Sequence, residues 1–155
     1  MEMQCTSIGI VSKAGDFSLL IDEPYRKGLV GLEGFGHVLV VWYADKIGNA
    51  GSNHMLFGKP YTNGPEQIGV FATRSPYRPN SICISVAQLV SVGIEEGRVG
   101  LAWLDAEMGT PILDLKPYHG SEDRVRDLVM PSWCNHWPHY LEESEAFNWE
   151  EEFAF

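Results

Sequence analysis

The sequence predicts a mainly β protein, a small antiparallel β-barrel followed by a short helical C-terminal extension. Three observations support this fold class. The apolar runs are short and rich in β-branched residues, glycine and proline separate them, and the body of the chain shows little helical periodicity. With 155 residues and 45% hydrophobic content, the chain can bury one core. We expect residues 1–120 to form the barrel domain and residues 121–155 to form an acidic, aromatic extension packed on or beside it.

Short strands account for most of the first 120 residues. The segments expected to be strands are 5–12, 17–22, 37–44, 68–72, 81–92, 98–105 and 110–118. Residues 13–16 suit a hairpin turn, residues 23–36 carry too many glycines for a stable helix, and residues 46–67 read as a long polar loop. In the C-terminal part, helical segments are expected at about 122–130 and 139–147.

The strand expected at 81–92 shows a clear period of two. Three β-branched residues alternate with three smaller ones, in the order Ile82, Cys83, Ile84, Ser85, Val86, Ala87. This alternation is typical of a strand with one buried face.

Composition argues against a membrane or secreted protein. The longest apolar run, residues 38–44, is far shorter than a membrane span, and no basic leader precedes an apolar stretch near Met1. Three cysteines without a CxxC pair fit reduced thiols. We therefore expect a cytoplasmic protein with no membrane partner.

The net charge of −10 is concentrated at the C-terminal end. Residues 141–155 hold six glutamates and no lysine or arginine, so removing these six charges from −10 leaves −4 for the rest of the chain. Overall charge therefore does not exclude a nucleic-acid partner. The acidic segment also carries aromatic residues, which allows two interpretations: a solvated helix whose aromatics pack back on the body, or a latch for a basic groove.

An unusual loop, "GVFATRSPYRPNSICIS" (69–85), places Arg74 and Arg78 between two apolar segments. Pro76 and Pro79 restrict the residues before them to extended conformations, so the loop is stiff. A stiff loop with guanidinium groups and free backbone N–H groups suits a carboxylate or phosphate ligand. The alternative is a rigid turn whose arginines are solvated or paired with surface acids.

A second polar segment, "LDAEMGTPILDLKPY" (104–118), brings carboxylates close to Lys116 and Tyr118 in the sequence. Carboxylates at a strand end can accept hydrogen bonds from ribose hydroxyls or pair with an ammonium group. An ordinary turn followed by a strand with paired charges remains the alternative.

Two other site types lack support in the sequence. No glycine-rich dinucleotide or P-loop fingerprint is present, which argues against those nucleotide folds. Cys134, His136 and His139 are potential metal ligands, but a structural site needs a fourth ligand at a recognisable spacing. We expect no metal site and instead a packed aromatic and histidine surface there.

Four segments in their order resemble one family. These are "IGIVSKAG", "GLVGLEGFGHVLVVWYAD", "GVFATRSPYRPNSICIS" and "LDAEMGTPILDLKPY". Together, over about residues 7–118, they are similar to the TsaA-like domain of the TrmO family, S-adenosylmethionine-dependent methyltransferases that methylate N6 of a modified adenosine in tRNA. The resemblance implies a compact antiparallel barrel that works as a homodimer and uses S-adenosylmethionine as cofactor, with tRNA as partner.

The resemblance also assigns cofactor-binding positions, which fall in four segments. They are Asp45 and Lys46; Phe71, Ala72, Thr73, Arg74 and Ser75; Ile84; and Asp105, Ala106, Glu107 and Met108. Arg78, Asn80 and Lys116 are expected to face the acceptor or brace the loop. Asp45, Tyr77 and Tyr118 are the catalytic candidates, by their location on matching segments.

The sequence departs from the family pattern at several of these segments. Ser81 and Cys83 replace a proline and a glycine, Met108 replaces an acid, and Asp45-Lys46 follows the strand where the family commonly has His-Gln. These departures keep two alternatives open: a methyltransferase of the same fold with a small-molecule acceptor, or a cofactor-binding module without catalysis.

Overall fold

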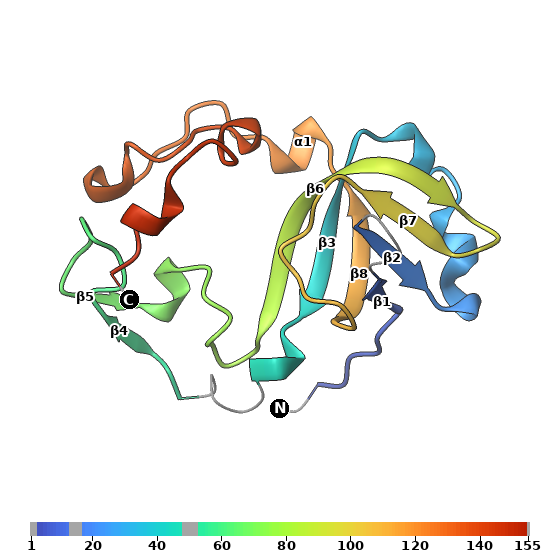
Figure 1. Cartoon of the computed structure of the whole chain (residues 1–155), viewed down its shortest axis with the longest axis horizontal. Coiled ribbons are helices and arrows are strands. Elements are labelled where there is room, and N and C mark those ends of the chain that lie inside the picture. The colour runs from blue at the N-terminus through green and yellow to red at the C-terminus, as the bar shows by residue number, and fades with distance from the viewer. Residues whose placement is uncertain (1–2, 13–16, 48–52, 155) are drawn as a thin grey trace.

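The computed structural model describes residues 3–12, 17–47 and 53–154. Six antiparallel strands close into a barrel in the order β1-β2-β7-β6-β3-β8 (Figure 1). Their bounds are β1 Gly9–Ser12, β2 Ser18–Ile21, β3 His37–Tyr43, β6 Ile82–Gly93, β7 Arg98–Leu101 and β8 Pro111–Pro117. The predicted fold class, a mainly β antiparallel barrel, is therefore confirmed. The hairpin turn predicted at 13–16 lies outside the described residues.

The barrel interior is filled by side chains from alternate strand positions, as the two-residue period of a strand requires. The core residues Leu19, Val38, Val40, Val99 and Ile112 are fully buried. Strand β1 closes the barrel, because Gly9 is paired with Ile21 in β2 on one side and with Ile112 in β8 on the other. Removal of these apolar side chains from water is the main contribution to the stability of the barrel.

Strand β6 shows the predicted alternation, but its isoleucines point outward. Ile82 and Ile84 are 39% and 49% exposed, whereas Ala87 on the opposite face is 3% exposed. The smaller face turns inward because Trp42 of the neighbouring strand β3 occupies the interior there and donates its indole N–H to Ser85 Oγ at 3.1 Å. The result is an exposed apolar stripe on the outer surface of β6.

A second, smaller unit stands beside the barrel. Strands β4 (Leu56–Gly58) and β5 (Gln67–Gly69) pair with each other in a sheet separate from the barrel sheet. The polar stretch predicted as a loop at 46–67 therefore contains β4. The predicted strand 68–72 becomes the end of β5 followed by a 3-10 helix, Val70–Ala72. In Figure 1 the C-terminal segment, drawn in orange and red, runs from the barrel to this hairpin.

Helical structure consists of short turns. Helix α1 spans Gly120–Asp123, and the 3-10 helices include η1 Glu23–Leu29, η2 Leu32–Gly34, η4 Val70–Ala72, η5 Ser132–Cys134, η6 Leu141–Glu143 and η7 Trp149–Glu151. The helices predicted at 122–130 and 139–147 are thus wrong in extent. Helix α1 ends because Arg124 takes an extended conformation, and the residues after it bury no apolar face: Val125 and Val129 are 70% and 89% exposed.

No helix within the described ranges combines the length and the hydropathy needed to cross a bilayer.

Candidate functional site at one end of the barrel

Polar segments from four parts of the chain meet at one end of the barrel. Strand β3 leads into a 3-10 turn at 45–47, and the turn carries Lys46, whose ammonium group pairs with the carboxylate of Glu107. The loop between η4 and β6 carries Arg74, whose guanidinium group donates to the carbonyl oxygen of Ile84. The first contact joins segment 45–46 to segment 105–108 across 61 positions, and the second joins segment 71–75 to β6 at Ile84.

The loop that follows β5 is held by its own hydrogen bonds. Thr73 Oγ1 donates to Val70 O at 2.9 Å and accepts from the Ser75 N–H at 3.2 Å, while Ser75 Oγ accepts from the Tyr77 N–H at 3.2 Å. Arg78 folds back over the loop, with one nitrogen 3.4 Å from Thr73 O and 3.5 Å from Ser75 O. These bonds fix the backbone and leave the Arg74 side chain exposed to solvent.

Cys83 lies among the charged groups of the site. Partial burial raises the pKa of its thiol, Arg78 and Arg74 act in the opposite direction, and Asp105 adds to the increase. Both loop arginines and Asp105 therefore influence the same thiol near the start of β6. The net upward direction keeps the thiol protonated near neutral pH.

The segment after β7 is also fixed by the backbone. Gly109 has a φ of 85°, in the region that favours glycine, and its N–H donates to Val11 O at 2.9 Å. Thr110 is 3% exposed and its N–H donates to Glu107 O at 3.1 Å. Asp105 and Glu107 are exposed, whereas Ala106 between them packs against the barrel core. The turn thus directs two carboxylates outward.

Apolar side chains are exposed in the same segments. Phe71 is 77% exposed, Met108 64%, Ile84 49% and Tyr77 44%. An aromatic ring, a thioether and an aliphatic side chain beside guanidinium and carboxylate groups suit a ligand that has a planar ring together with both positive and negative groups.

Two of the predicted residues lie away from this cluster. Tyr118 lies beside the other end of β3. Its N–H donates to His37 O, and its ring packs edge-on against the His37 ring with the ring centroids 6.2 Å apart. Tyr118 and Asp45 are therefore at opposite ends of β3, whose seven residues span about 20 Å at the usual rise per residue of a strand. Lys116 is on β8 and pairs with Asp114 at 2.7 Å, a contact that raises the pKa of Lys116. Asn80 lies two residues before β6 and is exposed.

The three possible metal ligands of the extension have other partners. Cys134 is buried with its sulfur 3.5 Å from Pro131 O, His136 pairs with Glu152 at 2.7 Å, and His139 Nε2 is 3.3 Å from Asn135 O. Across the part of the chain that the structure describes, no group of three or more His, Cys, Asp or Glu side chains is arranged to hold a metal ion.

The fold and the cluster define a class of protein: a small closed antiparallel barrel whose charged loops gather at one end. Within this class the chain belongs to a known family. Residues 6–124 match the family model of the tRNA-methyltransferase O N-terminal domain. The match includes every predicted site residue and ends before most of the C-terminal extension.

Relatives of known name fall into two groups. Human tRNA (adenine(37)-N6)-methyltransferase is 39% identical over 103 residues, which are 66% of this chain and 22% of the human one. A probable S-adenosyl-L-methionine-binding protein of Halobacterium salinarum is 40% identical over 95 residues, 61% of this chain and 69% of that protein. The S-adenosyl-L-methionine-binding protein of Archaeoglobus fulgidus is 36% identical over 110 residues, which are 71% of this chain and 74% of that protein. The chain therefore spans about a fifth of the mammalian relatives' length.

Solved structures agree with the family assignment. The crystal structure of TrmO from Pseudomonas aeruginosa superimposes with a TM-score of 0.63 at 26% identity, covering 83% of this chain and 62% of that one. Another TrmO crystal structure superimposes with a TM-score of 0.66, also at 26% identity, covering 84% of this chain and 64% of that one.

Sequence reasoning did not place Cys83 inside the charged cluster, and it did not find the contacts made by Glu152 in the extension. The position of Cys83 could have been inferred from the alternation of residue types in 82–87, which puts Cys83 and Ile84 on opposite faces of β6. For the second, nothing in the run of glutamates distinguishes the buried Glu152 from its exposed neighbours.

Proposed function

We propose that this chain binds S-adenosylmethionine at the charged end of the barrel and transfers its methyl group to N6 of a modified adenosine in tRNA. The observation that carries the proposal is that residues 6–124 match the family model and include the whole charged cluster. Relatives named tRNA (adenine(37)-N6)-methyltransferase and S-adenosyl-L-methionine-binding protein support both the donor and the acceptor.

The residues of the cluster fit the chemical groups of this cofactor. The exposed guanidinium of Arg74 suits its carboxylate, and the exposed carboxylates of Asp105 and Glu107 suit its ammonium group or ribose hydroxyls. The exposed side chains of Phe71 and Met108 offer an apolar surface for the adenine ring. The cluster would thus offer a cation for the cofactor carboxylate and carboxylates for its ammonium group or ribose, with Glu107 also paired with Lys46.

In the proposed reaction the N6 lone pair attacks the methyl carbon, and the carbon–sulfur bond breaks with its electron pair passing to sulfur. The proton on N6 then passes to a base or to water, which leaves S-adenosylhomocysteine and the methylated base. Because the sulfonium is already activated, orientation supplies most of the acceleration. Asp45, an exposed carboxylate beside the Lys46–Glu107 pair, and Tyr77 are the candidates to accept that proton.

Calorimetry with S-adenosylmethionine and S-adenosylhomocysteine tests the binding step, with Arg74→Ala as the decisive variant. Loss of a charge-assisted contact of about 1.5–3 kcal/mol should weaken binding. That loss is roughly a 10- to 150-fold rise in Kd. Arg126→Ala, which removes an exposed arginine outside the loop, is the matched control and should bind like the unmodified chain. Equal affinities of the Arg74→Ala and Arg126→Ala variants would exclude the proposed role of Arg74.

A second candidate is a cofactor-binding module that acts on no tRNA. The relatives that this chain covers most fully, among those described above, are named as binding proteins and not as methyltransferases. Incubation with tRNA and methyl-labelled cofactor separates the candidates. Transfer of label to tRNA supports methylation, and saturable binding without transfer to tRNA supports the binding module.

We also propose that the chain forms a homodimer in the cytoplasm. The exposed stripe of Ile82 and Ile84, beside Tyr43 on β3, offers an apolar surface that a second copy would cover. All three cysteines are free, as expected for a reducing compartment. Sedimentation equilibrium of the full chain tests the dimer, and a monomer at all measured concentrations would contradict it.

A further inference from the structure

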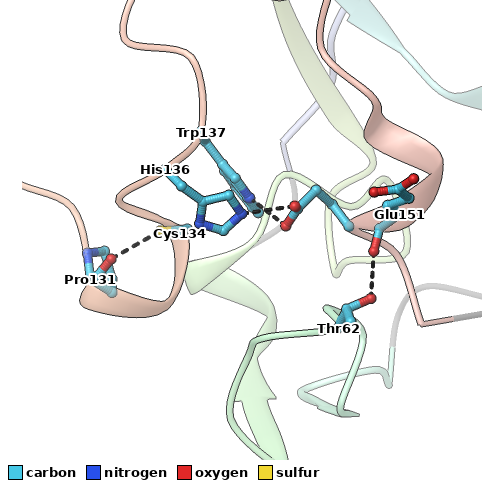
Figure 2. A network of polar contacts seen from close by, with 7 residues as sticks. Thr62, Pro131, Cys134, His136, Trp137 and Glu151 are labelled. Atoms are coloured by element: carbon cyan, nitrogen blue, oxygen red, sulfur yellow. Dashed lines mark hydrogen bonds and ion pairs between the residues drawn. The ribbon is translucent and has the colours of Figure 1, made fainter.

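The C-terminal segment is paired with the hairpin through its backbone. The Thr62 N–H donates to Glu152 O at 2.9 Å, the Ala154 N–H donates to Pro60 O at 3.1 Å, and Tyr61 and Phe153 form an antiparallel bridge between these bonds. Figure 2 shows a further contact, in which Thr62 Oγ1 donates to Glu151 O at 2.7 Å. Residues 60–62 and 151–154 thus form a short two-stranded ladder, which we call the clasp.

Glu152 joins the clasp to the preceding part of the extension. The residue is 8% exposed, and each of its carboxylate oxygens has a donor: His136 Nε2 at 2.7 Å and Trp137 Nε1 at 2.8 Å. Dashed lines in Figure 2 mark these two contacts of His136 and Trp137. The Trp137 hydrogen bond, and next the His136 one, lower the pKa of Glu152, so the group is ionised at neutral pH. A buried carboxylate needs such partners, and here they come from the turn at 132–138.

Aromatic packing encloses Tyr61 on the hairpin. Its ring stacks on Trp133, with the ring centroids 5.0 Å apart, and packs edge-to-face with Trp137, with the centroids 5.3 Å apart. Both tryptophans belong to the extension. Trp137 is also the donor to Glu152, so the same side chain contacts the hairpin and fixes the clasp. Loss of the Glu152 carboxylate would therefore release both the Trp137 ring and the backbone pairing.

The hairpin leads directly into the arginine loop. The Val70 N–H donates to Met55 O at 2.9 Å, Val70 is 1% exposed, and Arg74 follows four residues later. Since β4 and β5 pair with each other and not with a barrel strand, this hairpin is a two-stranded unit. Isolated hairpins are marginally stable in water. The extension supplies contacts on the side of the hairpin that carries Tyr61.

We propose that Glu152 is a positioning residue for the cofactor site. By holding residues 132–154 on the hairpin, it keeps the arginine loop, residues 70–80, in the conformation that binds the cofactor carboxylate. The inference rests on the proposed function for its ligand. It adds a role for a segment that lies mostly beyond the matched family domain.

The test compares Glu152→Ala and Glu152→Gln with Glu151→Gln, in the full chain. Glu151 is the matched control, because it is adjacent, exposed, and uses its backbone oxygen in the clasp. Hydrogen exchange at the amides of Val70 and Thr73 reports order in the loop, exchange in β3 reports the barrel, and calorimetry with S-adenosylhomocysteine reports the site. If Glu152→Ala lowers the competent fraction of the loop to about a tenth, the apparent Kd rises about tenfold.

We expect Glu152→Ala to speed exchange in the loop and weaken binding, Glu152→Gln to restore part of both, and β3 to stay protected in each. Faster loop exchange with unchanged affinity would overturn the proposal, as would unchanged exchange. If Glu152→Ala does not fold, Thr62→Val replaces it, and the same pattern at smaller amplitude is expected. If the unmodified chain binds no cofactor, the proposed function fails, while loop exchange still decides whether Glu152 orders the loop.

Discussion

Gly9 on β1 occupies a position where even one additional carbon is excluded, so Gly9→Ala should destabilise the barrel. A Cβ there would lie 2.3 Å from Leu20 O, 2.9 Å from Ile21 Cα and 3.1 Å from Leu20 C, all of them backbone atoms. Real Cβ atoms essentially never approach closer than 3.0 Å. Strand β2 cannot retreat, because it is paired with β7 on its other edge, nor can β1, because it is paired with β8.

The expected loss of stability is that of an overpacked core, about 1–3 kcal/mol. Replacing glycine by alanine also lowers the conformational entropy of the unfolded chain, which stabilises a protein by about 0.4–1 kcal/mol where the folded site accepts alanine. This gain is smaller than the expected steric loss. Each kcal/mol should lower the Tm by about 2–4 °C in a chain of this size. Because the Gly109 N–H donates to Val11 O, strain imposed on β1 should also disturb the 105–110 turn and weaken the proposed cofactor binding.

Urea unfolding followed by tryptophan fluorescence, together with thermal melting, measures the effect. Gly36→Ala is the control, because a Cβ at that position meets nothing within 4 Å. If Gly9→Ala and Gly36→Ala unfold at the same urea concentration, the steric reasoning is wrong.

Two further predictions concern partly buried hydrogen bonds. Ser85→Ala removes the acceptor of the Trp42 indole N–H, and it should lower the free energy of unfolding by about 1–3 kcal/mol, measured by urea unfolding. An unchanged midpoint would contradict the assigned bond. Glu152 has a folded-state pKa below its usual value near 4.5, so its contribution to stability is complete above that value and is lost as pH falls through the folded pKa. The difference in unfolding free energy between the unmodified chain and Glu152→Gln should therefore be constant at neutral pH and shrink in acid. A difference that stays constant down to pH 3, well below that usual value, would refute the role of the ionised carboxylate.

The strands were largely predictable because their signals are local. Runs such as 37–44 and 110–118 are β-branched and bounded by glycine, proline or polar residues, and the structure places β3 and β8 there. The direction in which β6 faces was not predictable, because it depends on Trp42, a residue of another strand that fills the interior. Hydrophobicity alone would have turned Ile82 and Ile84 inward.

The site segments could be identified from the sequence, but their contacts could not. Arg74 and Glu107 stand out by their motifs, whereas the pairing of Lys46 with Glu107 depends on barrel closure, which brings together residues 61 positions apart. Helices were overpredicted in the extension because glutamate and leucine favour helix locally. Within the second predicted helix only Leu141–Glu143 is helical, as a 3-10 turn, and the rings that pack on Tyr61 come from residues outside both predicted helices.

The pairing of Thr62 with Glu151 joins residues 89 positions apart. During synthesis at about 5–20 residues per second, the hairpin leaves the ribosome several seconds before the segment that covers Tyr61. Throughout that interval the Tyr61 ring has no Trp133 or Trp137 to pack on, and the nascent chain presents it to chaperones and to neighbouring chains. Expression yield should therefore depend on how quickly the ribosome translates the residues between Tyr61 and Trp133.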